Sequence, residues 1–389
     1  MRIVIATDKF KGCLSAAEVA SAMATGLRRG GQLVEVDLCP MADGGEGTVA
    51  ALVAATNGKL LSHRVTGPLP DTLVDATFGL LGSSANGPPT AVVEMAAASG
   101  LHLLRPEQRN PMLTTTYGTG QLLVAARDAG ARRIILGIGG SATVDAGLGC
   151  AQACGVEITL KDGTARTAGD PPLCGEDVGR VGRVVRERSL LGDISITVAC
   201  DVANGLFGVD GAAAVFGPQK GATPDQVQQL DEALEALAER LDMRQLAESP
   251  GAGAAGGLGF AMLAFFGAAL RPGIDIVMEA ANLRERLRKA DLCITGEGRL
   301  DGQTLCGKAP LGVARLCREV NVPCIAIAGT IDETARPALA EHFAEMRSLQ
   351  RPGLLVEECI GDAARLLAAA GEAALRDHLA RSESRRRGP

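Results

Sequence analysis

The sequence predicts an α/β protein of two domains, in which both ends of the chain share one doubly wound parallel sheet and the middle forms an inserted α/β domain. Three observations lead to this prediction. The chain has 389 residues, which exceeds the size at which a single core usually keeps growing. Short apolar runs alternate with helical periodicity near both termini, which is typical of parallel sheets covered by helices. A hydrophobic content of 47% supplies enough apolar side chains for two cores.

The N-terminal segment begins with a β-α-β-α pattern. Residues 3–6 form a short apolar, β-branched run that predicts a strand. Ser15 and Glu18 make a Ser-x-x-Glu capping box, which predicts the start of a helix that ends near Gly30. The next elements are expected to be a strand over 34–38 and a helix over 47–57.

The alternation of strand and helix patterns is interrupted after a turn at 66–71, where a different domain is expected to start. The period of leucines in residues 225–241 predicts an amphipathic helix. The other expected elements are strands at 74–80, 91–95, 133–137 and 194–200, helices at 119–129 and 146–154, and an alanine-rich helix after Gly257.

The opening pattern returns near the C-terminus, with strands expected at 292–295 and 324–328 and helices at 309–320 and 362–379. We therefore assign residues 1–65 and 283–389 to one discontinuous domain and residues 66–282 to the inserted domain. Ligands of such folds usually bind in a crevice at the carboxyl ends of the strands, so we expect an active-site cleft between the two domains.

Composition excludes several classes of protein. A net charge of −6, an aromatic content of 2% and the absence of tryptophan argue against a nucleic-acid binder. No apolar stretch approaches the roughly 20 residues that a membrane helix needs, and no signal peptide is evident. The 11 cysteines lie mostly in apolar runs, which favours reduced, buried thiols over disulfides. We expect a cytoplasmic protein without a membrane or nucleic-acid partner.

Several glycine-rich loops place charged or hydroxyl side chains beside bare backbone, a pattern that indicates phosphate handling. Asp8 and Lys11 follow the first expected strand, where the carboxyl ends of parallel strands meet the ligand, although an ordinary charged loop is an equal alternative. Asp43, Gly44 and Gly45 also lie between a strand and a helix, and the density of glycine there favours ligand contact.

Two further segments offer backbone donors or positive charge. Gly139, Gly140, Ser141 and Thr143 precede an expected helix, and their amides and hydroxyls can bind phosphate. Residues 302–308 have the spacing of a P-loop, but the position that should carry the Mg²⁺-binding hydroxyl is alanine. A true Walker A site is therefore rejected. Lys308 and Lys220 remain candidate phosphate contacts.

Carboxylates at the ends of other expected strands are candidates for metal binding and proton transfer. Glu297 and Asp301 share one loop and could hold Mg²⁺, with a solvated turn as the alternative. Asp201 ends another expected strand and is a candidate general base or metal-orienting group beside a transferred phosphoryl group. The four histidines have no catalytic or metal-binding spacing.

Taken together, these motifs resemble the bacterial glycerate kinase family over nearly the whole chain. The resemblance is carried by residues 7–16, 42–48, 115–120, 137–145, 215–222, 251–257 and 294–301. It implies phosphorylation of D-glycerate by ATP with Mg²⁺, usually to 2-phosphoglycerate, on two α/β domains of which one is flavodoxin-like. It also adds four residues to the candidates for substrate or nucleotide binding, namely Thr115, Thr116, Asp145 and Gly253.

On this resemblance, we expect Asp201 to accept the proton of the attacking hydroxyl while Lys11, Lys220 and the amides of residues 139–143 spread the negative charge. Family members commonly have glycine where this chain has Ala146. Two alternatives stay open, namely a kinase of another small hydroxy acid and a non-catalytic sensor of nucleotide or metabolite. The sequence does not decide between the 2- and 3-hydroxyl of glycerate or between a monomer and a homo-oligomer.

Overall fold

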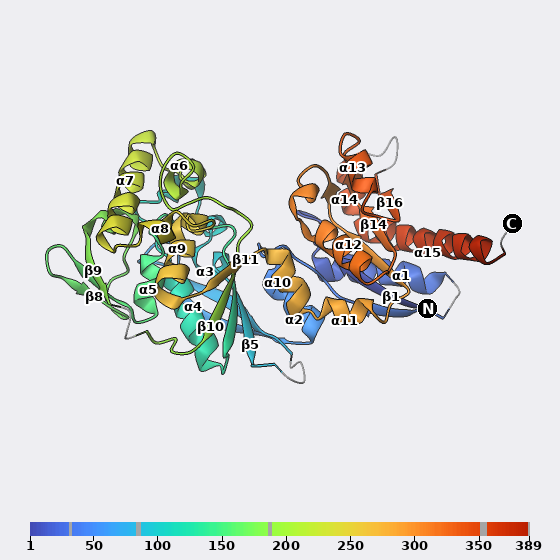
Figure 1. Cartoon of the computed structure of the whole chain (residues 1–389), viewed down its shortest axis with the longest axis horizontal. Coiled ribbons are helices and arrows are strands. Elements are labelled where there is room, and N and C mark those ends of the chain that lie inside the picture. Colours follow the sequence, from blue (N-terminus) through green and yellow to red (C-terminus); the bar gives the residue numbers. More distant parts are fainter. Residues whose placement is uncertain (31–32, 83–86, 186–188, 351–355, 388–389) are drawn as a thin grey trace. The chain divides into compact units, whose positions relative to one another are not determined.

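The structure is a computed structural model that describes residues 1–30, 33–82, 87–185, 189–350 and 356–387 (Figure 1). The chain forms two compact units. Unit 1 comprises Met1–Asp43, Ala50–Thr56 and Ile274–Pro389, and unit 2 comprises Gly44–Val49 and Asn57–Gly273. Among the described helices, none combines the length and apolar character needed to span a bilayer.

Unit 1 is built on a five-stranded, wholly parallel sheet in the order β16-β14-β12-β1-β2. Numbered by their order along this unit, the strands run 2-1-3-4-5 across the sheet, which is the flavodoxin-like order. The predicted fold class is therefore confirmed. The strands are β1 (Arg2–Thr7), β2 (Glu35–Leu38), β12 (Leu292–Gly296), β14 (Cys324–Ala328) and β16 (Glu345–Ser348), and a two-stranded sheet adds β13 (Arg299–Leu300) and β15 (Thr330–Ile331).

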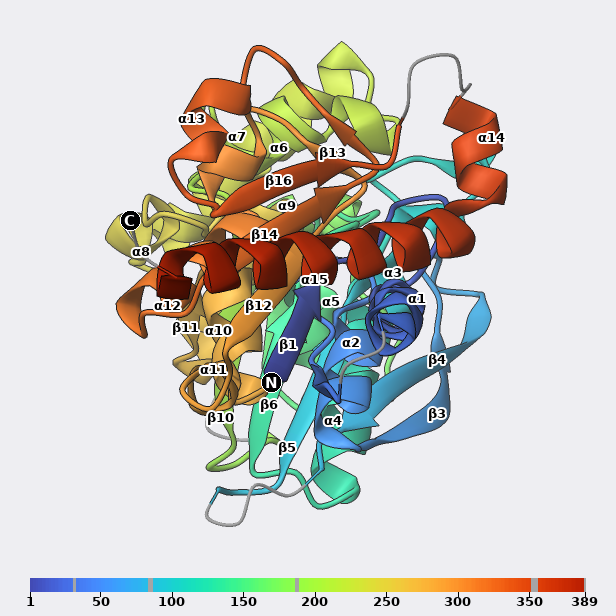
Figure 2. The same cartoon turned by 90° about the vertical axis from the view of Figure 1, so that its right-hand side faces the viewer.

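Two long helices of unit 1 cover one face of its sheet. Isoleucines of β1, β12 and β14 pack against α1 (Ala16–Arg29) and α15 (Ala363–Arg387). These two helices contact each other, and Figure 2 shows α15 along its length with α1 nearly end-on. The two helices approach so closely that a Cβ at Gly26 would lie 1.8 Å from the carbonyl oxygen of Ala368. The remaining helices are α10 (Gly273–Ala280), α11 (Leu283–Leu287), α12 (Ala309–Glu319), α13 (Arg336–Ala340) and α14 (Val356–Gly361).

The predicted start of α1 is confirmed in detail. Ser15 has an extended backbone and its Oγ accepts a hydrogen bond from the amide of Glu18, whose carboxylate accepts from the amide of Ser15 at 2.8 Å. This reciprocal pair satisfies two amides that the helix itself leaves without partners.

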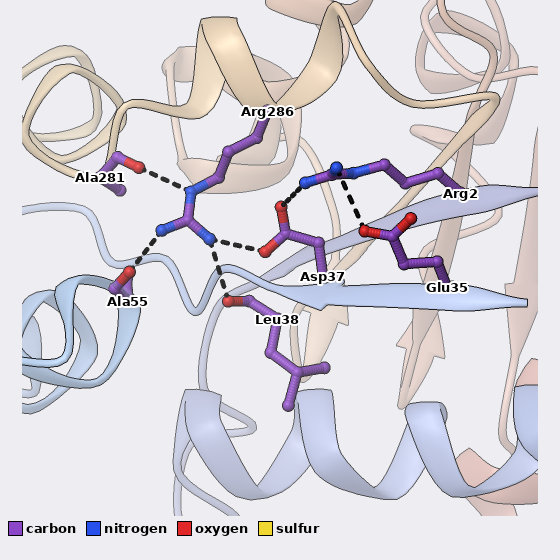
Figure 3. A network of polar contacts seen from close by, with 7 residues as sticks. All are labelled: Arg2, Glu35, Asp37, Leu38, Ala55, Ala281 and Arg286. Carbon is purple, nitrogen blue, oxygen red and sulfur yellow. Dashed lines mark hydrogen bonds and ion pairs between the residues drawn. The ribbon is translucent and has the colours of Figure 1, made fainter.

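The guanidinium of Arg286, in α11, joins three segments of unit 1 (Figure 3). It donates to the carboxylate of Asp37 at 2.6 Å and to the carbonyl oxygens of Ala55 at 2.5 Å and Ala281 at 2.9 Å. Asp37 also receives a hydrogen bond from Arg2 at 3.1 Å. Arg286 thereby fixes the C-terminal end of α2 (Thr48–Thr56) to β2.

Unit 2 has a six-stranded mixed sheet in the order β11-β10-β6-β5-β4-β3. Its four strands from β11 to β5 are parallel to one another. Strand β4 pairs antiparallel with β5, and β3 pairs antiparallel with β4. The strands are β3 (Lys59–Thr66), β4 (Leu73–Leu80), β5 (Thr90–Glu94), β6 (Arg133–Gly137), β10 (Ser195–Ala199) and β11 (Ala269–Arg271). A small antiparallel sheet contains β7 (Glu157–Leu160), β8 (Ala165–Arg166) and β9 (Val181–Val185).

Two apolar cores stabilise unit 2, one around the large sheet and one beneath α7. The predicted stripe of α7 is confirmed for Leu230, Leu234 and Leu237, which are buried, whereas Leu241 follows the helix and is only partly buried. The helices of this unit are α3 (Ala96–Ser99), α4 (Tyr117–Asp128), α5 (Leu148–Ala153), α6 (Ala212–Phe216), α7 (Pro224–Arg240), α8 (Arg244–Ala247) and α9 (Ala254–Phe266).

The observed units differ from the expected boundaries in three places. Strand β3 was not anticipated, and it pairs with β4 along its whole length, so unit 2 begins at Asn57 instead of residue 66. The second boundary falls at Gly273, before the expected position at 282. A short piece of the early chain, Gly44–Val49, also belongs to unit 2.

Candidate active site

The carboxyl ends of β1 and β12 in unit 1 place two acidic residues at the topological switch point of the sheet. The two strands are neighbours, and the amide of Asp8 donates to the carbonyl oxygen of Gly296 at 2.9 Å. Asp8 therefore lies beside the residue that precedes Glu297. In open α/β sheets of this order, the switch point is where ligands bind.

Both of these carboxyl groups are almost completely buried, with exposures of 8% for Asp8 and 7% for Glu297. Burial raises the pKa of Glu297 to about 7, although the hydroxyl of Thr304 donates to its Oε1 at 2.6 Å. Burial and the negative charge of Asp43 raise the pKa of Asp8 to about 6. Burial thus favours the protonated form of each carboxyl group, and neighbouring carboxylates add to this effect.

Lysines offset part of the negative charge: Lys9 lowers the pKa of Asp8, and Lys308 acts on both carboxyl groups. Lys308 lies at the N-terminus of α12, and its charge lowers the pKa of both Asp8 and Glu297. The charge of Asp301 acts on Glu297 in the opposite direction. Four of the predicted acidic residues and Lys308 therefore lie within electrostatic reach of one strand edge, which are Asp8, Asp43, Glu297, Asp301 and Lys308.

The donor set at this edge fits Mg²⁺. Carboxylate oxygens are the ligands that this ion prefers, and a divalent cation would reverse the raised pKa values by favouring the charged forms. The hydroxyl of Thr7, at the end of β1, is fully buried and has no hydrogen-bond partner among the described residues. Such an orphaned polar atom beside buried acids is consistent with a site built for a polar ligand.

Lys11 is exposed in a tight turn that follows Asp8. The turn is closed by mutual backbone contacts of Phe10 and Leu14, and the amide nitrogen of Lys11 would lie 3.5 Å from a Cβ at Gly298. The turn that carries Lys11 therefore packs beside the loop after β12.

In unit 2, the glycines of the segment 44–49 allow the chain to lie against the carboxyl ends of β6 and β10. A Cβ at Gly44 would be 2.7 Å from the Cβ of Ala199, and a Cβ at Gly137 would be 2.5 Å from the carbonyl oxygen of Gly44. The amide of Val49 donates to Glu94 at 2.7 Å. Close packing thus explains Gly44, and a Cβ at Gly139 would likewise lie 3.2 Å from Gly45.

Asp145 is completely buried and accepts hydrogen bonds from several groups of unit 2. Thr116 donates to its Oδ2 from both the amide, at 2.8 Å, and the hydroxyl, at 2.7 Å. The amides of Gly147 and Gly149 donate to it at 3.1 and 3.3 Å. Burial raises the pKa of Asp145, and these hydrogen bonds counteract that effect.

The two predicted threonines of this region make internal bonds. The hydroxyl of Thr115 donates to the carbonyl oxygen of Leu173 at 2.7 Å, and that of Thr116 is used by Asp145. Both residues therefore position the backbone around Asp145. Ala146 adopts a φ of 53°, a left-handed conformation that favours glycine.

Lys220 lies close to Asp145 and is also buried, with 2% exposure. Its Nζ donates to the carbonyl oxygen of Thr143 at 2.8 Å. Burial lowers the pKa of Lys220 to about 7, while the charge of Asp145 raises it. A buried lysine with a lowered pKa is characteristic of functional sites.

The remaining candidates of unit 2 occupy strand ends or packing positions. Asp201 lies two residues after the end of β10 and is exposed. Its Oδ1 accepts a hydrogen bond from the amide of Gly273 at 2.9 Å. Gly139 and Gly140 are exposed after β6, whereas Ser141 is buried and bridges to Gly100. Gly253 has a packing role, because a Cβ there would lie 1.9 Å from the carbonyl oxygen of Gly205.

The predicted residues thus separate into two groups. Unit 1 contains Asp8, Lys11, Asp43, Glu297, Asp301 and Lys308, and unit 2 contains Gly44, Gly45, Thr115, Thr116, Gly139, Gly140, Ser141, Thr143, Asp145, Asp201, Lys220 and Gly253. The sequence analysis missed Thr304 and Thr7. The position of Thr304 in the P-loop-like segment 302–308 was a signal for it, whereas Thr7 gave none.

A flavodoxin-like unit with acidic strand ends, joined to a second α/β unit with a buried lysine, is the class of structure expected of a phosphotransferase. Comparison with known proteins makes the assignment specific. The chain belongs to the glycerate kinase family, whose model matches residues 3–379.

Curated relatives and a solved structure agree with this assignment. The chain is 48% identical to the glycerate kinase of Haemophilus influenzae over 86% of this chain and 87% of the relative. It is 45% identical to the glycerate 2-kinase of Escherichia coli over 86% of each chain. A crystal structure assigned to glycerate kinase 2 of Salmonella typhimurium LT2 superposes with a TM-score of 0.87 at 41% identity, covering 98% of this chain and 99% of the other.

Proposed function

We propose that the protein transfers the γ-phosphoryl group of ATP to D-glycerate and forms 2-phosphoglycerate. The observation that carries the choice of substrate and product is the 45% identity to the E. coli protein named glycerate 2-kinase. Phosphoryl transfer needs charge neutralisation and positioning more than covalent chemistry. The acidic edge of unit 1 would supply carboxylates for Mg²⁺, and unit 2 would supply the ammonium of Lys220 and exposed backbone amides for phosphate oxygens.

Asp201 is the proposed general base. Its exposed carboxylate follows β10, and the amide of Gly273 holds one of its oxygens in place. A carboxylate with an anchored orientation can accept the proton of the glycerate hydroxyl as that hydroxyl attacks phosphorus. Asparagine at this position would keep the hydrogen bond from Gly273 but could not accept the proton.

Positive charge and backbone donors would stabilise the transferred group. Lys220 would contribute its ammonium from a buried position, where a charge interacts more strongly than in water. Lys11 and the amides of Gly139 and Gly140 would act on phosphate oxygens from the surface, whereas the amide of Ala142 already donates to the carbonyl oxygen of Ser99 at 2.9 Å. Because Gly139 and Gly140 are exposed, their amides are accessible to such a ligand.

Glu297 and Asp301 are the proposed ligands of Mg²⁺, with Asp8 beside them. Bound Mg²⁺ would neutralise phosphate charge and orient the phosphate chain. Thr304 would hold Glu297 in position, because its hydroxyl donates to one carboxylate oxygen and leaves the other for the ion. Lys308 would limit the repulsion among the carboxylates before the ion arrives.

We infer a reducing, cytoplasmic setting, with ATP and glycerate as the partners. All cysteines whose side chains the structure describes are free, which fits a compartment that keeps thiols reduced.

The product of one incubation tests the proposal. Phosphorus-31 NMR of protein, ATP, Mg²⁺ and D-glycerate should give ADP and a phosphomonoester doublet, because the 2-phosphate couples to a single carbon-bound proton. A triplet would identify the 3-phosphate and overturn the proposed regiochemistry. Asp201→Asn should still bind ATP while turnover falls on the order of 10²–10³-fold.

The alternatives give different results in the same assay. A kinase of another small hydroxy acid would show a higher kcat/KM with that acid than with D-glycerate in a substrate panel. A sensor would bind nucleotide and release no ADP when glycerate is added.

A further inference from the structure

Three cysteines of unit 1 lie close together, and none of them is among the proposed catalytic residues. Cys293 lies in β12, Cys317 in α12 and Cys324 at the start of β14, and their sulfur atoms all lie within 4.8 Å of one another. All three thiols are buried and free. The residues come from three separate elements, so tertiary packing alone creates the cluster.

The arrangement of the sheet explains why these thiols meet. Cys293 and Cys324 are register partners on neighbouring parallel strands. The next residues, Ile294 and Ile325, belong to the core beneath α1 and α15, and successive side chains of a strand point to opposite faces. The two thiols therefore face the other side of the sheet, where Cys317 meets them from α12.

Three converging sulfurs form a ligand set that suits a soft ion. A three-coordinate ion with metal–sulfur bonds of about 2.3 Å holds its sulfurs about 4 Å apart, which the observed spacing accommodates with small movements. Structural zinc sites use four ligands, and the cluster has three among the described residues. Thiolates select Cu(I) among the remaining common ions.

A thiolate is the form of cysteine that binds metals, so each of the three thiols would lose its proton when the ion binds.

We propose that Cys293, Cys317 and Cys324 form a buried three-thiolate site that binds one Cu(I) ion. Binding would replace the thiol protons, which leave to solvent, and would change no oxidation state. The ion would link α12 to β12 and β14, so its expected consequence is greater stability of unit 1. Simple core packing of three small apolar side chains is the competing interpretation.

The test is anaerobic titration of the whole protein with Cu(I) buffered by bicinchoninate, followed by desalting and metal analysis. Cys317→Ala should lose about one equivalent of copper relative to the unsubstituted protein. Cys154→Ala is the matched control, because Cys150 and Cys154 form a second buried thiol pair, in unit 2. Copper should also raise the melting temperature, and this increase should be absent in Cys317→Ala and preserved in Cys154→Ala.

X-ray absorption of the copper-loaded, unsubstituted protein gives an answer that does not depend on the folding of any variant. Three sulfur neighbours per bound ion would support the proposal. Failure to retain copper, two sulfur neighbours, or equal copper content in Cys317→Ala and the unsubstituted protein would overturn it.

Discussion

The ammonium group of Lys220 is enclosed in unit 2, where its Nζ donates to the main-chain oxygen of Thr143 at 2.8 Å. One hydrogen bond to a neutral carbonyl replaces little of the hydration that the charge loses. This imbalance is the reason that burial lowers the pKa of Lys220 from 10.5 to about 7.

The Lys220→Met variant should be more stable and much less active. Between about pH 7 and 10.5 the unfolded chain binds a proton at this lysine that the folded chain does not, so the free energy of unfolding rises with pH. The variant should lose this slope of about 1.4 kcal/mol per pH unit and lose on the order of 10²–10³-fold in kcat. Urea unfolding across pH and steady-state kinetics measure both effects.

Lys161→Met is the matched control, because Lys161 is an exposed lysine of the same unit. It should change neither the pH slope nor kcat. A Lys220→Met enzyme with ordinary turnover would remove this lysine from the proposed charge stabilisation.

Substitution of Glu297 should weaken the response to Mg²⁺. Glu297→Gln keeps the size of the side chain and an oxygen for the hydroxyl of Thr304, but it removes the charge that attracts the ion. The Mg²⁺ concentration for half-maximal velocity should rise about tenfold or more, since one charged contact is worth about 1.5–3 kcal/mol. Glu341→Gln, which alters an exposed carboxylate of the same unit, should leave it unchanged.

The pH dependence of Mg²⁺ activation follows from the same residue. The pKa of Glu297 is raised to about 7, so the carboxyl group becomes protonated, and a poor ligand, as pH falls below that value. Half-saturation by Mg²⁺ should therefore require more ion at pH 6 than at pH 8 in the unsubstituted protein. An equal requirement at both pH values would argue against Glu297 as a ligand.

Local sequence signals predicted much of the fold. The capping box of Ser15 and Glu18 located the start of α1, and the apolar run at 324–328 coincides with β14. Strand β3 was missed because its charged and apolar residues follow no clear alternation, and its pairing with β4 decides its conformation. Propensity describes short segments, whereas such pairing is a tertiary effect.

The candidate site shows the same division. Asp8 and Glu297 could be inferred because both follow apolar strands, whose carboxyl ends are where parallel sheets bind ligands. The partnership of Thr116 with Asp145 spans 29 residues and depends on how α4 and α5 pack. No spacing rule in the sequence encodes it.

A comparison of two glycines separates steric packing from backbone strain. Both Gly44, with a φ of +93°, and Gly12, with a φ of +73°, adopt conformations that disfavour side chains. A Cβ at Gly44 would collide with Ala199 at 2.7 Å, whereas a Cβ at Gly12 would meet nothing within 4 Å. Gly12→Ala should lose about 1 kcal/mol of unfolding free energy, and Gly44→Ala should lose about 1–3 kcal/mol more.

Urea unfolding of the two variants measures this difference. Equal losses would mean that the segment 44–49 moves away from β10 without penalty, and the packing role of Gly44 would then be rejected.

The contacts of Arg286 with Asp37 and Ala55 predict an asymmetry between two arginines of neighbouring positions. Arg286 is largely buried, with 23% side-chain exposure, and its partner Asp37 has 15% exposure. Arg288 is exposed at 56% and pairs only locally, with Glu285 one helical turn earlier, among the ion pairs of the described residues. Arg286→Met should lower the free energy of unfolding by about 2–3 kcal/mol, because it leaves the partly buried carboxylate of Asp37 and two carbonyl oxygens short of donors. Arg288→Met should change the free energy of unfolding by less than about 1 kcal/mol, as expected of an exposed pair.

Urea unfolding of both variants measures the asymmetry. Arg286→Lys restores the charge and should recover only part of the loss. An ammonium cannot reproduce the planar set of donors that reaches Asp37, Ala55 and Ala281 together. If the two methionine variants unfolded at the same urea concentration, the contacts of Arg286 would not be what fixes the end of α2 to β2.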